Sequence, residues 1–234
     1  MKAAFITGAD RGLGRGFVDF LLQEGYIVFA GVLEKGGDLP QAQNFFPIPL
    51  DVTDDVSIEL AVMRVLQQTS SLHLLINNAG VNKNTATGNQ KDLVSSLPDL
   101  DRKLMLKMFE INAVSPLMVT KKFLPLLLDD PSFVINISSD RASFHHQEPG
   151  DYKGNYGYRG SKIALTMLTF CSLYDMPKNV KTFAVHPGDV KSAMNSKGTQ
   201  QPQEQAEKIL NITKNWNDKN NGAFLNYDGS LFPL

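Results

Sequence analysis

Short apolar runs alternate with longer stretches of helical periodicity along this chain. The apolar runs are rich in valine, isoleucine and phenylalanine, and polar residues do not alternate regularly within them. This pattern is typical of strands that are buried on both faces of a parallel sheet. We expect strands over residues 3–7, 27–32, 72–77, 133–138, 181–186 and 223–226.

Helix-sized segments separate the expected strands. The first covers residues 15–24, where Phe17, Phe20 and Leu21 share one face and Gly25 supplies a C-terminal stop. Strands that alternate with helices predict an α/β fold, in which a doubly wound, mostly parallel sheet carries helices on both faces.

Further helices are expected downstream. One should follow the cluster of acids and threonine that begins at Asp51, with Val56, Leu60 and Met63 facing inward. Two more should cover residues 104–128 and 158–174.

The composition is that of a globular protein and excludes several other classes. Of the 234 residues, 42% are apolar, enough for the core of one domain over residues 1–234. Lysine and arginine total 23 against 24 acids, a balance that argues against nucleic acid or an anionic membrane as the main partner. A single cysteine, Cys171, excludes an internal disulfide, and no apolar run reaches the roughly 18 residues of a membrane span. The first strand begins too early for a signal peptide, so we expect a cytoplasmic protein.

A glycine-rich turn, TGADRGLG at residues 7–14, joins the first strand to the first helix. Gly8, Gly12 and Gly14 remove Cβ atoms where a pyrophosphate could approach the backbone. The helix N-terminus would offer that anion free N–H groups and a positive dipole end. The alternative is an ordinary tight turn, but the strand before and the amphipathic helix after favour a nucleotide.

Tyr158 and Lys162 stand four residues apart in an expected helix and so share one face. A lysine ammonium beside a phenol favours the phenolate and would lower the tyrosine pKa from about 10. Such a tyrosine can exchange a proton with a carbonyl or an alcohol near neutral pH. Tyr174 and Lys178 have the same spacing, but Pro177 would break the helix between them. Spacing alone nominates Tyr158, with a solvated helix face as the alternative.

Taken together, these segments resemble the short-chain dehydrogenase/reductase family. The resemblance continues through Asp51-Val52 after the third strand, NNAG at 77–80, Asn112, NISS at 136–139, YRGSK at 158–162 and PGDVKS at 187–192. It implies a Rossmann fold and hydride transfer between a nicotinamide cofactor and a carbonyl or alcohol substrate, with no metal. YRGSK and the ending FLNYDG at 224–229 look like the branch named for the C-factor developmental signalling protein.

The resemblance assigns catalytic roles. Tyr158 is the implied acid/base, and Lys162 should lower its pKa and bond the nicotinamide ribose. Asn112 should hold a water of the proton relay. Ser139 should bond the substrate oxygen, with Ser138 and Ser143 as weaker candidates.

The same resemblance assigns residues to the cofactor. The first of these residues form the glycine turn, and the later ones, in order along the chain, should contact the adenine, the adenosine ribose and the nicotinamide amide. Tyr158 and Lys162 join them at the nicotinamide end. The implied residues are Gly8, Asp10, Arg11, Gly12, Leu13, Gly14, Asp51, Val52, Asn78, Ala79, Gly80, Pro187, Gly188, Val190 and Ser192.

The end of the second strand bears on which nicotinamide is used. No carboxylate stands there to bind a ribose diol, because Glu34 comes one or two residues late. Against NADP(H), Leu33 stands where some NADP-dependent members of the family carry a second basic residue, and Lys35 is the nearest cation. Arg11 could pair with a 2′-phosphate, or could be only a solvated turn residue. The sequence therefore favours NADP(H), with NAD(H) as the alternative.

Three variable segments would select the substrate, over residues 82–98, 140–157 and 189–202, and none carries a readable signature. The segment from Asn82 and Lys83 to Pro98 is interpreted as a surface loop. The segment 140–157 lengthens the interval between Ser139 and Tyr158, so it should lie over the active site. Its His145, His146, Glu148 and Asp151 are interpreted as an ordinary polar loop rather than a zinc site.

Two expectations concern the whole protein. The helices near 104–128 and 158–174 carry more apolar residues than one inward face can bury, which favours a homodimer or homotetramer. These residues are Leu124, Leu126, Leu127, Leu128, Leu165, Leu168 and Phe170. The alternative to an enzyme is a regulatory or signalling protein that keeps the fold and the cofactor without relevant turnover.

Overall fold

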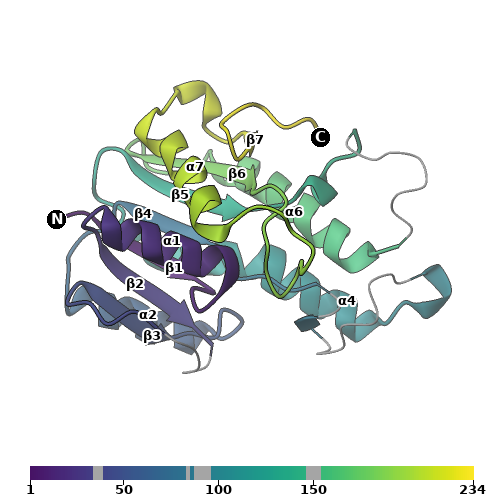
Figure 1. Ribbon diagram of the computed structural model, residues 1–234, viewed down its shortest axis with the longest axis horizontal. Helices are drawn as coiled ribbons and strands as arrows, with labels where there is room; N and C mark the ends of the chain where they lie inside the picture. Colours follow the sequence, from purple (N-terminus) through teal and green to yellow (C-terminus); the bar gives the residue numbers. More distant parts are fainter. Residues whose placement is uncertain (34–38, 83–84, 87–95, 146–153) are drawn as a thin grey trace.

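The computed structural model of the chain describes residues 1–33, 39–82, 85–86, 96–145 and 154–234. Within these residues seven strands form one parallel sheet in the order β3-β2-β1-β4-β5-β6-β7 (Figure 1). The strand order reverses between β1 and β4, which makes the doubly wound arrangement expected from the sequence. The strands are β1 (Ala3–Thr7), β2 (Ile27–Val32), β3 (Phe45–Pro49), β4 (Leu74–Asn77), β5 (Ser132–Ile137), β6 (Val180–His186) and β7 (Phe224–Asn226).

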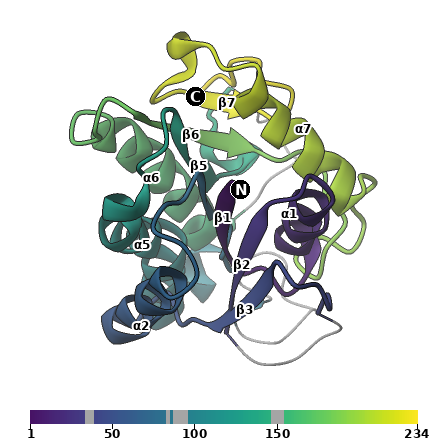
Figure 2. The same ribbon diagram turned by 90° about the vertical axis from the view of Figure 1, so that its left-hand side faces the viewer.

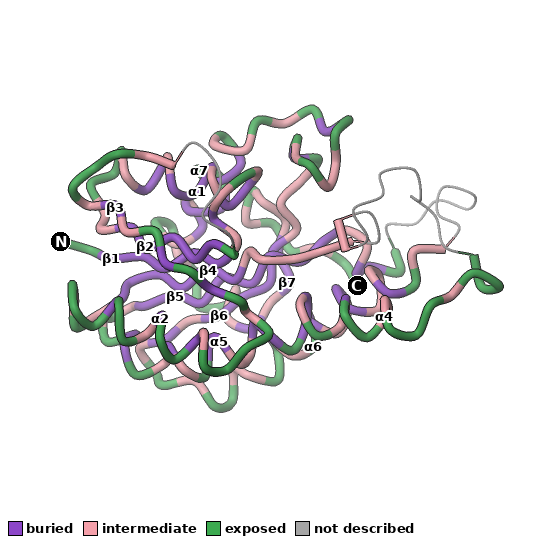
Figure 3. Tube along the Cα trace, turned by 90° about the horizontal axis from the view of Figure 1, so that it is seen from below, coloured by how far each residue is buried: buried purple, intermediate pink, exposed green. Residues whose placement is uncertain are grey.

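Helices cover both faces of this sheet. On one face α1 (Gly12–Gln23) packs beside α7 (Pro202–Lys214), and on the other lie α2 (Asp55–Leu66), α5 (Ser115–Phe123) and α6 (Tyr156–Ser172) (Figure 2). Each face has its own apolar core, because alternate strand residues point to opposite sides. Figure 3 shows the strands buried between helices whose outer faces are exposed. No helix in the described ranges is long and apolar enough to cross a membrane.

One strand, β3, was not among the strands expected from the apolar runs. β3 contains Pro47 and Pro49, which cannot donate to a sheet ladder, and this composition hides the strand from pattern analysis. The structure pairs β3 with β2 alone, at the edge of the sheet, where a missing N–H is tolerated. α7 was also missed, because its polar N-terminal half weakens the helical pattern.

The inward face expected for α2 is wrong. Val56, Leu60 and Met63 are 61%, 50% and 59% exposed. The buried residues are Ile58, Ala61 and Val65. Both triplets fit a helical period, and the rotation of the helix against the sheet selects between them.

The helix expected over 104–128 is interrupted. α4 (Arg102–Phe109) leads into a five-residue π-helical segment, Glu110–Val114, before α5 begins. The Ser115 hydroxyl donates to the Glu110 carbonyl at 2.8 Å, across this widened turn. After α5 the chain continues as a short 3-10 helix, Leu124–Leu126. Such π-helical turns inside α-helices are frequent at functional sites.

Candidate active site

A cavity of about 800 Å³ opens at the carboxyl ends of the central strands. Among the residues expected from the sequence to bind cofactor or substrate, all line this cavity except Asn112 and the weaker serine candidate Ser143. The lining comes mainly from the turns that follow β1 to β6, and from the N-terminal part of α6. Parallel strands end at the same edge of a sheet, so residues far apart in sequence meet there.

The glycine turn forms a cradle that only small residues can make. Gly8 has φ +62°, in the left-handed region, and a Cβ at Gly14 would lie 2.1 Å from the Gly8 carbonyl oxygen. The Asn78 amide holds the turn by donating to the carbonyls of Thr7 and Gly8 at 3.0 and 2.8 Å. Within the described residues no side chain caps the first turn of α1, so its N–H groups face the cavity uncapped. These features fit the pyrophosphate of a dinucleotide.

The adenosine end of the cavity carries few charges. Arg11 lines it with a side chain 76% exposed, and its guanidinium lies 3.5 Å from the Asp10 carboxylate. Leu33, directly after β2, also lines it, and no second cation stands there. One oxygen of Asp51 already accepts from the backbone N–H and hydroxyl of Thr53, at 2.9 and 2.7 Å. Glu34, whose late position bore on the cofactor, lies outside the described residues.

Tyr158 and Lys162 share the face of α6 that borders the cavity. The Lys162 ammonium lies 5.8 Å from the centre of the Tyr158 ring. Lys162 is 4% exposed and donates to the Ile137 carbonyl at 2.7 Å. Burial lowers the pKa of Lys162 to about 8. The pairing expected from the spacing is therefore present in space.

The expected lowering of the Tyr158 pKa is wrong. The pKa of Tyr158 is raised to about 12, chiefly by burial and also by the negative charge of Asp140. The hydrogen bond with Ser139 and the positive charge of Arg141 lower this pKa without offsetting the burial. Desolvation outweighs the lysine because the Lys162 ammonium is engaged by a backbone carbonyl, not by the phenol oxygen. Tyr158 is consequently protonated across the neutral range.

Of the three candidate serines, Ser139 is the one whose hydroxyl lowers the pKa of the Tyr158 phenol. It follows β5 and lines the cavity. Ser138 points toward α6, bonding Thr166 at 2.8 Å, and its hydroxyl donates to the Lys162 carbonyl at 3.3 Å. Ser143 accepts from the backbone N–H of His145 at 3.1 Å and lies outside the cavity lining. The placement favours the assignment of Ser139.

Asn112 lies in the π-helical segment, behind the cavity wall, and is fully buried. Its side chain exchanges two hydrogen bonds with the backbone of Val81, both at 2.8 Å, and donates to the Ser161 hydroxyl at 2.9 Å. It therefore ties the segment after NNAG to α6. The water relay assigned to Asn112 stays a prediction.

The segment after β6 spans the cavity. Gly188 has φ +84°, and Pro187, Gly188, Val190 and Ser192 all line the cavity. A Cβ on Gly12 would lie 3.2 Å from that of Ser192, so this loop reaches the glycine turn. Asp189 holds the loop by accepting from the Asn195 amide at 2.7 Å and from Thr199, and these bonds lower its pKa.

Sequence reasoning missed several cavity residues. Asn82, expected in a surface loop, lines the cavity and donates to the Met194 carbonyl at 3.3 Å. The ring nitrogen Nδ1 of His186 accepts from the backbone N–H of Asp140 at 3.0 Å. No motif marks these residues, because the sheet alone brings β5 and β6 together. Further residues of this kind are Lys107 and Arg159. Arg141 and Asn155 also line the cavity, as expected for the segment 140–157.

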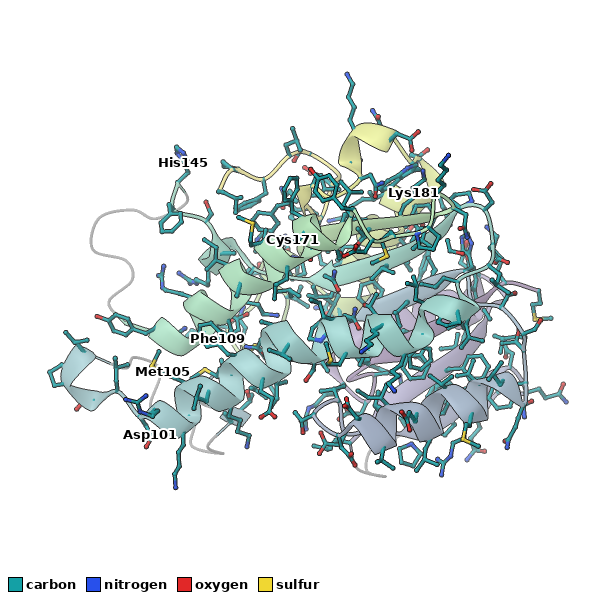
Figure 4. The ribbon with its side chains drawn as sticks, turned by 180° about the vertical axis from the view of Figure 1, so that it is seen from behind. Asp101, Met105, Phe109, His145, Cys171 and Lys181 are labelled. Carbon is teal, nitrogen blue, oxygen red and sulfur yellow. The ribbon has the colours of Figure 1, made fainter. Side chains whose placement is uncertain are left out.

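The interpretation of the histidine pair as part of a polar loop concerns residues that lie mostly outside the described ranges. His145 lies at the end of a loop that points away from the sheet (Figure 4). His146, Glu148 and Asp151 fall outside the described residues, as does Lys83. Among the described residues no three potential ligands cluster.

The doubly wound sheet, the uncapped glycine turn and the Ser139–Tyr158–Lys162 group define an α/β protein with a dinucleotide site and an acid/base group in one cavity. Comparison with known proteins agrees. A family model described as short chain dehydrogenase matches residues 2–203.

Three relatives illustrate the similarity. The short chain dehydrogenase tazN of Aspergillus terreus is 30% identical over 201 residues, which cover 80% of this chain and 41% of that protein. Estradiol 17-beta-dehydrogenase 2 of Mus musculus is 30% identical over 218 residues, covering 89% and 53%. The crystal structure of NADPH-bound carbonyl reductase from chicken fatty liver is 30% identical with a TM-score of 0.84, covering 100% and 99%. The chain thus spans only part of the two curated relatives.

The chain belongs to the short-chain dehydrogenase family. It has a doubly wound Rossmann fold, as the carbonyl reductase structure at 30% identity does.

Proposed function

We propose that this protein reduces a carbonyl substrate with NADPH, and runs the reverse oxidation with NADP⁺, using Tyr158 as proton donor and acceptor. The carrying observation is that Ser139, Tyr158 and Lys162 line the same cavity as the glycine turn. The NADPH-bound carbonyl reductase at 30% identity supports this reading, as does the missing acid after β2.

A bound nicotinamide would supply or accept the hydride. The protein supplies position and proton. Tyr158, with its pKa raised to about 12, carries the proton that a reduced carbonyl oxygen needs. Lys162 is charged below its pKa of about 8 and places a positive charge beside the phenolate that forms. Proton donation is therefore available at neutral pH.

The central test is Tyr158→Phe, which removes the proton and keeps the ring. Carbonyl reduction should fall by about 10²–10⁴-fold, the usual loss of a general acid. NADPH binding, followed by fluorescence, and the melting temperature should stay near native. Tyr174→Phe is the matched control, because Tyr174 is 77% exposed beyond the end of α6 and should lose nothing.

Near-native reduction by Tyr158→Phe would contradict the acid/base assignment. If NADPH binds to the native protein but no carbonyl in a broad panel is reduced, the regulatory or signalling function is favoured instead. The cytoplasmic location expected from the sequence stays a prediction.

A further inference from the structure

The backbone of Gly188 runs between the cavity and a layer of side chains behind it. Gly188 lines the cavity with φ +84°, and the family resemblance assigns this segment to the nicotinamide amide. A Cβ at Gly188 would overlap Oε1 of Gln200 and lie 2.8 Å from Nε2 of Gln205. Neither glutamine is among the described residues that line the cavity. The two amides therefore support this backbone from behind.

Gln205 is an unusual residue for its position on α7. It is fully buried, on the face where Ala206, Ile209 and Leu210 pack into the core. Its Nε2 donates to Oε1 of Gln200, whereas its own Oε1 has no hydrogen-bond partner among the described residues. A buried amide with an unpaired oxygen destabilises a fold, and a leucine of similar size would avoid that cost. The amide of Gln205 therefore needs a reason other than stability, and its bond to Gln200 supplies one.

Gln200 connects α7 to the segment that borders the cavity. Its backbone N–H donates to the Asp189 carbonyl at 3.0 Å, and its carbonyl accepts from the Lys191 N–H at 3.0 Å. Val190 lies between these two bonds and forms a parallel bridge with Gln200. The residues directly after Gly188 are thus paired with Gln200 through the backbone, while the Gln200 side chain is bonded to α7.

A third side chain completes the layer and comes from the segment FLNYDG at 224–229, which the proposed function does not use. A Cβ at Gly188 would lie 3.0 Å from Cδ1 of Tyr227. The Lys208 ammonium of α7 lies 5.2 Å from the centre of the Tyr227 ring, a cation–π distance. α7 therefore contacts both the amide pair and the tyrosine. Gln205 and Tyr227 both lie beyond residue 203, where the match to the family model ends.

We propose that Gln205 is a positioning residue for the nicotinamide half of the cofactor and acts through Gln200 and Gly188. The hydrogen-bonded amides hold the Gly188 backbone at a fixed place in the cavity wall, against which the nicotinamide amide would bind. The adenosine half belongs to the other end of the cavity, beside Arg11, and does not depend on this support. The inference rests on the proposed function, because it takes NADPH as the cofactor.

The deciding experiment compares two ligands on Gln205→Leu, which keeps the size of the side chain and removes its amide. NADPH carries both halves of the cofactor, whereas adenosine 2′,5′-bisphosphate is the adenosine half without the nicotinamide. The dissociation constant of NADPH should rise about fivefold, the loss expected for one hydrogen bond. That of adenosine 2′,5′-bisphosphate should change less than twofold. Calorimetry measures both constants without turnover.

Gln203→Leu is the matched control, since it is the same substitution two residues earlier on α7. The Gln203 amide donates to Gln23 of α1 at 3.0 Å, at the surface. Its loss should leave both dissociation constants within twofold of native. A second readout is the kcat for carbonyl reduction at saturating NADPH. It should fall in Gln205→Leu and not in Gln203→Leu, because hydride transfer depends on how closely the reacting atoms approach.

The outcomes separate this inference from the proposed function. Unchanged NADPH binding by Gln205→Leu would overturn the role of Gln205, and so would an equal loss for both ligands, which indicates a general disturbance of the cavity. A native protein that binds NADPH but reduces no carbonyl would overturn the proposed function, and the two dissociation constants would still decide the role of Gln205. Should Gln205→Leu fail to fold, Gln200→Leu breaks the same hydrogen bond from a partly exposed position and should show the same difference between the ligands.

Discussion

Burial decides the charge of the residues that matter most in this cavity. The spacing of Tyr158 and Lys162 suggests a phenol with a lowered pKa, but its burial raises that pKa to about 12. The same burial lowers the pKa of Lys162 to about 8. Both shifts favour the neutral form of each group. Tyr158 is consequently prepared to donate a proton rather than to accept one.

Arg11 is the residue on which cofactor preference is expected to depend. It lines the adenosine end of the cavity, and its guanidinium can bond a 2′-phosphate. Arg11→Ala should weaken NADPH binding about tenfold, the effect of one charge-assisted contact, and NADH binding less than twofold. Titration of both cofactors by calorimetry measures the difference.

Arg64→Ala is the control, since Arg64 is an exposed cation on α2 outside the cavity. Equal losses for NADPH and NADH in Arg11→Ala, or tighter NADH binding by the native protein, would show that Arg11 does not select the phosphate.

At the scale of elements, α2 shows how one sequence offers two apolar stripes. Val56, Leu60 and Met63 repeat at helical spacing, and so do Ile58 and Val65 with Ala61. The N-cap fixes where the helix begins, with the Asp54 carboxylate accepting from the Val56 N–H at 3.0 Å. Packing against the sheet and α5 then decides which stripe is buried.

Substitutions in the two stripes should change the free energy of unfolding by different amounts. Ile58→Ala removes a fully buried side chain and should lower the free energy of unfolding by about 2–5 kcal/mol. Leu60→Ala, at a position 50% exposed, should change it by about 0.5 kcal/mol or less. Urea denaturation followed by circular dichroism compares them. A larger loss for Leu60→Ala would mean that this stripe is covered, for example by another copy of the chain.

At the scale of the whole molecule, some of the apolar side chains that favour an oligomer are buried within the chain's own core. Leu126, Leu127 and Leu165 are buried in the chain itself. Leu128 and Phe170 are 63% and 46% exposed. α4 and α6 also pack closely, with Met105 and Phe109 of α4 on the side shown in Figure 4. A smaller apolar surface than expected therefore remains on these helices.

We still expect a homodimer or homotetramer through this surface. Phe170→Lys places a charge in the expected interface and should convert the oligomer to monomers at micromolar concentration. Sedimentation velocity measures the change. Leu60→Lys, on the opposite part of the same side of the sheet, should leave the assembly intact. A native protein that sediments as a monomer would contradict the prediction.

The sequence by itself determined what is local. Six of the seven described strands, the glycine turn and the spacing of Tyr158 and Lys162 are each contained in a short segment, so hydrophobic periodicity and residue type were sufficient. The family resemblance of the sequence also assigned Ser139 and Asn78 to the site, and both residues line the cavity.

Only the tertiary structure decided what depends on neighbours from distant segments. The proline-containing β3 forms because β2 offers a partner at the sheet edge. The rotation of α2 depends on the sheet beneath it, and the Tyr158 pKa depends on how much protein surrounds the phenol. The hydrogen bond from the Asp140 N–H to the His186 ring exists because parallel strands β5 and β6 end side by side. Desolvation and packing are properties of the assembled core, and no short segment of the sequence contains them.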